Sequence, residues 1–196
     1  MIGAIVLAAG SSSRMGRPKA LLPVEGTTFL GRVLATLRAS GVSTIRVVLG
    51  QHAEEIRGAV TLRADVVVIN PTPEAGMLSS VRHGVRALPE EVDAFLLWPV
   101  DHPTVLPETV RKLVAAFREG GAPVVVPVHA GRRGHPVLFA SRLKDELLLA
   151  PDAVGAKAVV GAHEDAVRAV EVHDPGVLAD VDTPEAYARI VGKPLP

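Results

Sequence analysis

The sequence predicts an α/β protein, a single Rossmann-like domain whose mainly parallel sheet carries helices on both faces. Short apolar, β-branched runs alternate along the chain with longer runs whose apolar residues recur at helical spacing. The length of 196 residues suits one large hydrophobic core and is short for two. We therefore expect one domain over residues 1–196, built from alternating strands and helices.

The first half of the chain contains the clearest alternation. Its strands are apolar or β-branched runs between turn residues, expected at 2–8, 44–49, 66–69 and 93–100. Its helices repeat apolar residues three or four positions apart, expected at 29–40, 53–60 and 76–88. Thr27 or Thr28 can cap the first helix and Gly41 ends it, because these residue types favour those positions.

The second half continues the pattern with shorter elements. Its strands are expected at 123–128, 134–139 and 167–172, the last alternating as an edge strand does. Its helices are expected at 107–119, 141–149 and 154–162, with a final helix from Thr183 and Pro184. Right-handed crossovers bring the carboxyl ends of parallel strands to one edge of the sheet, so ligand sites are expected there.

Composition excludes several classes of protein. The 21 basic and 21 acidic residues balance, so no overall field would attract nucleic acid or an anionic membrane. The absence of cysteine excludes disulfides, thiolate metal sites and cysteine nucleophiles. The apolar run 2–8 is too short for a membrane span and no basic segment precedes it. We expect a cytoplasmic protein without nucleic-acid or membrane partners.

The loop after the first strand, residues 7–19 (LAAGSSSRMGRPK), is small and basic. Ala9, Gly10 and Ser11 have little bulk, so their backbone N–H groups can approach a ligand closely. Arg14 and Lys19 add two cations, an arrangement that suits a polyphosphate. The spacing excludes the GxxxxGK phosphate loop. The alternative is a loop with solvated cations, which we rank second.

Three aspartates are candidate metal ligands. Asp101 follows the most apolar predicted strand, and Asp180 and Asp182 would point to one side of an extended segment. One or two carboxylates together with phosphate oxygens and water suit Mg²⁺. The alternative is that these aspartates cap the helices that follow them.

Several motifs together resemble those of the MobA-like nucleotidyltransferases, and among them the molybdenum cofactor cytidylyltransferases. Residues 7–19 fill every defined position of the family signature LAAGxSxRMGxxK. Further matches, in chain order, are Asn70 with GMxxS at 76–80, DxP at 101–103, GxxGHP at 131–136 and DxDTPE at 180–185. The resemblance extends from residue 2 to about residue 190 and implies the nucleotide-diphospho-sugar transferase fold.

The resemblance implies transfer of CMP from CTP to the terminal phosphate of molybdenum cofactor, a phosphorylated pterin, with release of pyrophosphate. It implies that residues 1–105 bind the nucleotide and 106–192 the acceptor, with a molybdoenzyme or its chaperone as a possible partner. Arg14, Lys19 and Asp101 would be catalytic, and Asp101 and Asp182 would bind Mg²⁺, with Asp182 preferred to Asp180. The nucleotide-binding residues would be Leu7, Ala8, Ala9, Gly10, Ser11, Arg14, Lys19, Asn70, Gly76 and Ser80. The acceptor-binding residues would be Arg132, Arg133, Gly134 and His135.

Other functions stay open at this point. One is a guanylyltransferase for the same cofactor, although the methyl group of Ala9 would crowd a purine sooner than a pyrimidine. Another is a cytidylyl or uridylyl transferase acting on a sugar or alcohol phosphate. A non-catalytic carrier of the pterin or nucleotide is a third, but it would not need Lys19 together with both metal-ligand positions. Family members more often carry glutamine at the position of His102, so the role of this side chain is open.

Overall fold

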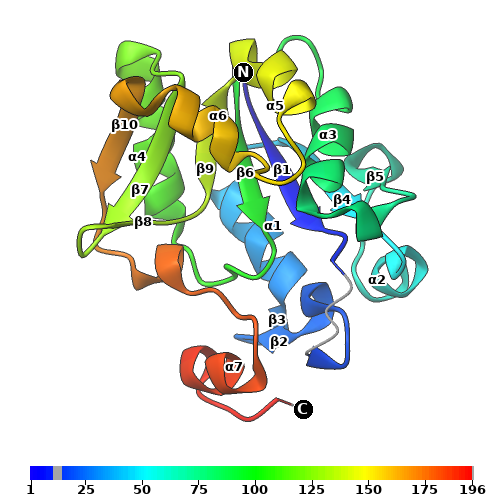
Figure 1. Ribbon diagram of the computed structural model, residues 1–196. Coiled ribbons are helices and arrows are strands. Elements are labelled where there is room, and N and C mark those ends of the chain that lie inside the picture. The colour runs from blue at the N-terminus through cyan, green and yellow to red at the C-terminus, as the bar shows by residue number, and fades with distance from the viewer. Residues whose placement is uncertain (11–14, 196) are drawn as a thin grey trace.

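The computed structural model describes residues 1–10 and 15–195, and within them the chain forms an eight-stranded mixed sheet (Figure 1). Seven strands follow the order β10-β7-β9-β6-β1-β4-β5, and β8 pairs with β7. The strands are β1 (Ile2–Ala8), β4 (Thr44–Leu49), β5 (Val67–Ile69), β6 (Ala94–Pro99), β7 (Val124–His129), β8 (Arg132–Arg133), β9 (Val137–Ala140) and β10 (Val167–Glu171). A small two-stranded sheet joins β2 (Pro23–Val24) to β3 (Thr27–Thr28). The predicted α/β class is confirmed.

Helices cover both faces of this sheet (Figure 1). They are α1 (Phe29–Ala39), α2 (Ala53–Ala59), α3 (Met77–Arg86), α4 (Pro107–Gly120), α5 (Lys144–Leu149), α6 (Lys157–Ala162) and α7 (Pro184–Val191). Apolar residues of α1 and α4 share one buried cluster, and those of α3, α5 and α6 share the cluster on the opposite face. The strands between the two clusters are buried on both sides, which explains their continuous apolar sequence.

The central strand β1 shows how side chains are distributed between the two clusters. Val6 belongs to the cluster with α1, and its neighbour Ile5 belongs to the cluster with α3, because successive strand residues point to opposite faces. Gly84 lets α3 pack directly on this strand: a Cβ added there would lie 2.4 Å from Ile5 Cγ2. A glycine in mid-helix is therefore required by packing at this position.

Strand β9 runs antiparallel to both of its neighbours, β6 and β7, whereas the other pairs along the main path are parallel. Because of this reversal, β9 starts at the edge where β6 ends, with Val137 opposite Leu97. The predicted strand 134–139 is corrected at its start, since β9 begins at Val137. The short strand β8 was not predicted, because two residues are too few to show a period.

The helix caps show whether Asp101 caps a helix, which was the alternative to its predicted role as a metal ligand. The Thr28 side chain accepts a hydrogen bond from Gly31 N at 3.1 Å, and Thr183 accepts one from Ala186 N at 3.2 Å, so both predicted threonine caps are confirmed. Helix α4 receives its cap from Asp174, whose Oδ2 accepts from Leu106 N at 2.9 Å. The alternative that Asp101 caps this helix is therefore wrong.

Further predicted boundaries differ from the structure, and two of them have a visible cause. The predicted helix 154–162 begins only at Lys157, because Gly155 has a positive φ of 72° within a turn. The predicted strand 66–69 begins at Val67, because Ala64–Val66 forms a 3₁₀ turn. Within residues 1–10 and 15–195, no helix has the length and apolar character needed to cross a membrane.

Candidate active site

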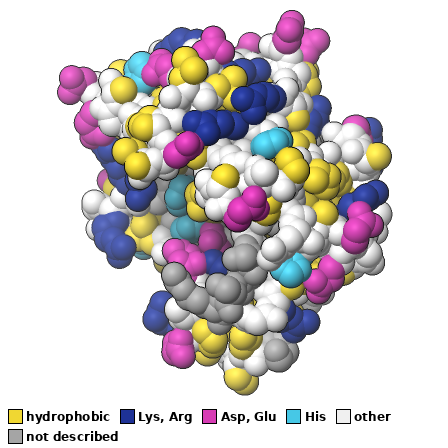
Figure 2. Space-filling view, turned by 45° about the vertical axis from the view of Figure 1, so that its right-hand side comes forward, with side chains coloured by type: hydrophobic (Ala, Val, Ile, Leu, Met, Phe, Trp, Pro, Cys, Tyr) yellow, Lys and Arg dark blue, Asp and Glu magenta, His cyan; other side chains and the backbone are white. Residues whose placement is uncertain are grey.

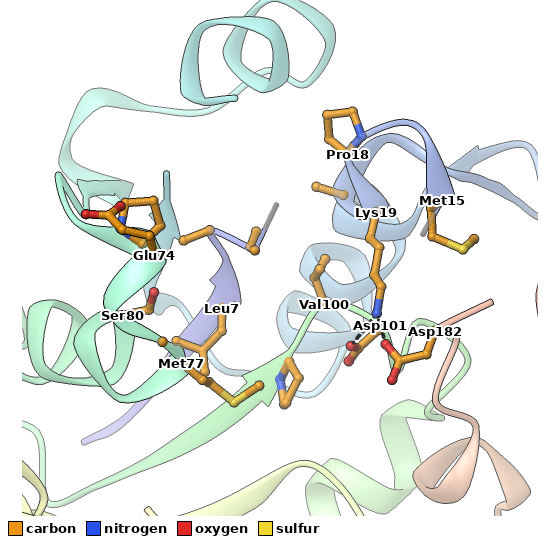
Figure 3. A pocket seen from close by; sticks show the side chains of 17 residues that line it. Leu7, Met15, Pro18, Lys19, Glu74, Met77, Ser80, Val100, Asp101 and Asp182 are labelled. Atoms are coloured by element: carbon orange, nitrogen blue, oxygen red, sulfur yellow. Dashed lines mark hydrogen bonds and ion pairs between the residues drawn. The ribbon is translucent and has the colours of Figure 1, made fainter. Parts of the chain in front are cut away.

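A cavity of about 460 Å³ opens where β1 and β6 end (Figure 3). The residues predicted to bind nucleotide or metal that line this cavity are Leu7, Ala8, Ala9, Gly10, Lys19, Gly76, Ser80, Asp101 and Asp182. The rest of its wall is formed by Met15, Pro18, Ala20, Pro73, Glu74, Met77, Pro99 and Val100. Ser11 and Arg14, which were also predicted, lie outside the described residues. The fold thus gathers distant stretches of the chain around one cavity.

Lys19 lies between two carboxylates on one side of the cavity (Figure 3). Its Nζ donates to Asp101 Oδ2 at 3.0 Å and also to Asp182 Oδ1. Burial opposes the charged form of Lys19, but the nearby carboxylates of Asp101 and Asp182 outweigh it and raise the pKa of the ammonium above its ordinary value. The Lys19 side chain is 15% exposed and that of Asp182 is 47% exposed, so solvent reaches this group mainly from the Asp182 side.

Backbone hydrogen bonds explain why Asp101 and the distant segment 180–182 meet. Val100 N donates to Leu7 O at 3.0 Å, which joins the ends of β6 and β1. Val181 N then donates to Asp101 O at 3.0 Å, so Asp180 and Asp182 are held on either side of this link. The main chain of Asp101 therefore fixes the positions of Asp180 and Asp182.

Asn70 lies beneath the cavity and does not line it. Its side chain is buried, and its Nδ2 donates to Ser80 Oγ at 2.9 Å. Its Oδ1 accepts from Thr72 N at 3.0 Å and from Ser79 Oγ at 3.2 Å. In this structure Asn70 therefore holds the start of α3 against the end of β5 and positions Ser80 at the cavity wall.

A group of three side chains next to Lys19 has the spacing of a metal site. Asp101, His102 and Asp180 each offer a ligand atom, and these atoms lie within 4.8 Å of one another. Burial, followed by repulsion from Asp101 and Asp182, raises the pKa of Asp180. The structure thus groups Asp180 with Asp101, whereas Asp182, the preferred ligand from sequence, contacts Lys19.

His102 and His135 pack against each other beside this group. Their ring centroids are 4.9 Å apart, although 33 positions separate them in the sequence. Burial lowers the pKa of His102, partly offset by Asp101 and Asp180. Burial, aided by the charge of His102, also lowers the pKa of His135 to about 4. Both imidazoles are therefore neutral at neutral pH.

The loop 134–136 is fitted closely against the segment Pro175–Leu178. His135 N donates to Val177 O at 2.9 Å, and a Cβ added at Gly134 would lie 2.3 Å from the same oxygen. On its other side, a Cβ added at Gly176 would lie 2.6 Å from Thr104 O. Main chain thus contacts main chain across three loops, which places His135 near His102.

The two arginines predicted to bind the acceptor lie on the exposed strand β8, away from the cavity wall. Arg133 makes a two-pronged ion pair with Glu164, with N–O distances of 2.6 and 2.9 Å. Of the predicted acceptor-binding residues, the structure brings Gly134 and His135 next to the carboxylate group, while Arg133 is held by Glu164. A single sequence gives no signal for this long-range ion pair.

The MobA-like NTP transferase domain family matches residues 4–167 of the chain. Among curated proteins, the chain is 29% identical to the molybdenum cofactor cytidylyltransferase of Escherichia coli K12, over 95% of this chain and 93% of that protein. It is 30% identical to nicotine blue oxidoreductase of Paenarthrobacter nicotinovorans, over 95% of each. It is 33% identical to the molybdenum cofactor guanylyltransferase of Rhizobium meliloti, over 83% of this chain and 76% of that protein.

Solved structures show the same architecture. Rv0371c from Mycobacterium tuberculosis H37Rv superposes with a TM-score of 0.85 at 32% identity, covering 98% of both chains. A structure of Rv0371C in complex with manganese superposes with a TM-score of 0.79 at 30% identity, covering 97% of this chain and 98% of that one. The similarity therefore covers the carboxylate group and the loop 134–136 as well as the first half of the chain.

Proposed function

The chain belongs to the MobA-like NTP transferase family, and from this premise we propose that it transfers CMP from CTP to the terminal phosphate of molybdenum cofactor. The observation that carries the proposal is the position of Lys19, between Asp101 and Asp182 at a cavity lined by the small residues of the first loop. A fixed cation among exposed amides suits the phosphates of a nucleotide, and two carboxylates beside it suit a divalent metal.

The reaction needs no nucleophile from the protein. A phosphate oxygen of the acceptor attacks the α-phosphorus of CTP, a new P–O bond forms, and the bond to pyrophosphate breaks. Positioning and charge neutralisation supply the rate acceleration in such a transfer. A lysine is charged at neutral pH, and the raised pKa of Lys19 shows that this site favours the ammonium, which can stabilise the charge that develops on the phosphates. Arg14 is proposed to act with it.

A divalent metal is part of the proposal. The unpartnered oxygen Asp101 Oδ1, shielded from solvent beside further carboxylates, supports a cation at this position. Mg²⁺, held by Asp101 and Asp182, would neutralise phosphate charge when bound. Lys19 would then have to exchange its contacts with the two carboxylates for contacts with phosphate oxygens, which its flexible four-carbon side chain permits.

The choice of CTP over GTP rests on the first loop and on the match to a cytidylyltransferase over nearly the full length of both chains. Ala9 lines the cavity and brings a methyl group to it. That methyl restricts a purine more than a pyrimidine. Use of GTP with the same acceptor is the alternative, and it would leave the roles of Lys19 and Asp101 unchanged.

Pyrophosphate release from CTP, measured with molybdopterin cofactor and Mg²⁺, tests the proposal. We expect Asp101→Ala to abolish release while the fold is retained, and an exposed control, Asp165→Ala, to leave it unchanged. A thermal-shift panel should give the largest stabilisation with CTP, because a ligand that binds only the folded state raises its stability. Unchanged turnover in Asp101→Ala would refute the assigned site, and a larger shift with GTP would favour guanylyl transfer. Binding without any pyrophosphate release would indicate a carrier.

A further inference from the structure

A second cavity lies at the opposite edge of the sheet, where strands β1 and β4 begin. Its volume is about 550 Å³, which is within the range of small-molecule sites. Its wall comes from the start of β1, the turn after α1 and one face of α4, and consists of Met1, Ile2, Ser40, Gly41, Val42, Ser43, Arg111, Val114, Ala115 and Arg118. Among the described residues, none lines both this cavity and that of the candidate active site.

Two arginines of α4 make this cavity positively charged. Arg111 and Arg118 are seven positions apart, which is about two helical turns, so both lie on the same face of α4. Arg111 Nη1 donates to Ala39 O at 3.2 Å, which holds this guanidinium against the last residue of α1. Within residues 1–10 and 15–195, neither arginine forms an ion pair, and no acidic residue lines the cavity.

The acidic side chains of α4 are paired with other cations. Glu108 contacts Lys112 at 3.2 Å, and Glu119 contacts Arg168 of β10 at 2.6 Å. On the face of the molecule shown in Figure 2, acidic and basic side chains are interspersed. The second cavity is different, because its two arginines border a space to which the described chain brings no carboxylate. A bound anion would supply the missing partner.

Part of the cavity wall is apolar. Ile2, Val42 and Val114 are buried members of the core cluster that contains residues of α1. Ala115 lies between the two arginines in the sequence of α4 and brings only a methyl group to the wall. Inorganic phosphate alone would leave this apolar wall without a contact. A ligand that fits the cavity therefore combines an apolar body with an anionic group.

We infer that this cavity binds an organic anion, a molecule with an apolar body and a phosphate or carboxylate group, through Arg111 and Arg118. The site is distinct from the one proposed for the nucleotide and the acceptor, and the inference does not depend on the proposed function. Arginine suits this role because its planar guanidinium can form two parallel hydrogen bonds to a phosphate or a carboxylate. Arg111 is already held by Ala39 O, so part of the site is formed before a ligand binds.

Binding of 1-naphthyl phosphate and of 1-naphthoate to the whole protein, measured by isothermal titration calorimetry, tests this site. The tighter of the two probes identifies the anionic group that the cavity prefers. We expect Arg111→Ala and Arg118→Ala each to weaken binding about tenfold or more, as the loss of a charge-assisted hydrogen bond would. Ala115→Asp should weaken binding similarly, because its carboxylate would pair with the arginines and repel the anion. Ala115→Asn, of nearly the same size, should change the affinity much less.

Two control variants should keep the affinity of the unmodified protein. Arg86→Ala removes an exposed arginine at the end of α3, and Lys19→Ala removes the cation of the candidate active site. Weaker binding in Lys19→Ala and unchanged binding in Arg118→Ala would place the probes in the active-site cavity and overturn the inference. Unchanged affinity in Ala115→Asp would also overturn it, as would the absence of saturable binding of either probe. Arg118 and Ala115 are exposed, so their variants keep the test valid if Arg111→Ala fails to fold.

Discussion

The carboxylate of Asp174 accepts a 2.6 Å hydrogen bond from the hydroxyl of Thr109, 65 positions earlier in the chain. Both residues are buried, and the same oxygen accepts from Leu106 N at 2.9 Å. The other oxygen accepts from Gly176 N at 2.9 Å. One carboxylate therefore caps α4 and also fixes the segment that leads to Asp180.

Replacing Asp174 should destabilise the protein. Asp174→Ala would leave two backbone N–H groups and the Thr109 hydroxyl without their acceptor, so we expect a loss of about 1–3 kcal/mol in the free energy of unfolding. Urea denaturation measures this loss. The exposed Asp165→Ala serves as the control and should change stability by less than about 0.5 kcal/mol. Equal stabilities of the two variants would contradict the capping role.

Two helical glycines should respond in opposite directions to alanine. A Cβ at Gly84 would lie 2.4 Å from Ile5 Cγ2, so Gly84→Ala should cost about 1–3 kcal/mol by overpacking. A Cβ at Gly58 meets no described atom within 4 Å, so Gly58→Ala should gain about 0.5–1 kcal/mol from helix propensity. Thermal or urea unfolding of both variants provides the comparison. Stabilisation by Gly84→Ala would show that α3 does not pack as described.

Stability should depend on pH through His135. Burial, aided by the charge of His102, lowers the pKa of His135 from 6.5 to about 4. Between these values the unfolded chain binds a proton that the folded protein does not, so stability is greatest above 6.5 and falls as the pH drops towards 4. The loss should reach about 2–3 kcal/mol. In His135→Gln, most of this loss of stability between about pH 7 and about pH 5 should disappear, as measured by urea unfolding. An identical pH dependence in the variant would mean that this imidazole is readily protonated in the folded state.

Lys19 should matter for turnover far more than for folding. Lys19→Ala removes the cation proposed to stabilise charge on the phosphates, and we expect kcat to fall about a hundredfold or more. The matched control is Lys112→Ala, which removes a lysine paired with Glu108 on α4. Steady-state kinetics with CTP and the pterin acceptor compare the two. A fall of similar size in both variants would contradict the assignment.

Substitutions in the loop 131–136, predicted to bind the acceptor, should impair use of the acceptor and leave CTP binding nearly unchanged. We expect Arg132→Ala and His135→Ala to lower kcat/KM for the acceptor about ten- to a hundredfold, as the loss of a charge-assisted hydrogen bond would, and to leave CTP binding nearly unchanged. Arg133 is already paired with Glu164, so comparing Arg133→Ala with Glu164→Ala shows whether that pair holds the loop or the substrate. Equal losses for CTP and acceptor would assign the loop to structure or to the nucleotide.

The sequence predicted most of the fold because its strands are buried on both faces and its helices are amphipathic, so both periods are visible locally. It did not predict the reversed direction of β9, because that direction is set by antiparallel pairing with β6 and β7, which are distant in sequence or in register. The first loop and the end of β6 were predicted as cavity walls because parallel strands end at one edge. The contact between His102 and His135 was not predicted, since nothing local indicates a pair 33 positions apart. Asp180 and Asp182 could not be distinguished from sequence, because their directions depend on the main-chain link at Val181.

The main-chain contact of Gly134 with Val177 has a consequence for redesign of this enzyme. It divides the connection between β7 and β9 into two parts with different tolerance to change. The tip around β8 is exposed, so new residues inserted there can extend outward without disturbing the core. An insertion between 134 and 136 would push against Val177 and, through Gly176, against the loop that carries Thr104. Engineering for a different acceptor should therefore lengthen the hairpin tip and leave its base untouched.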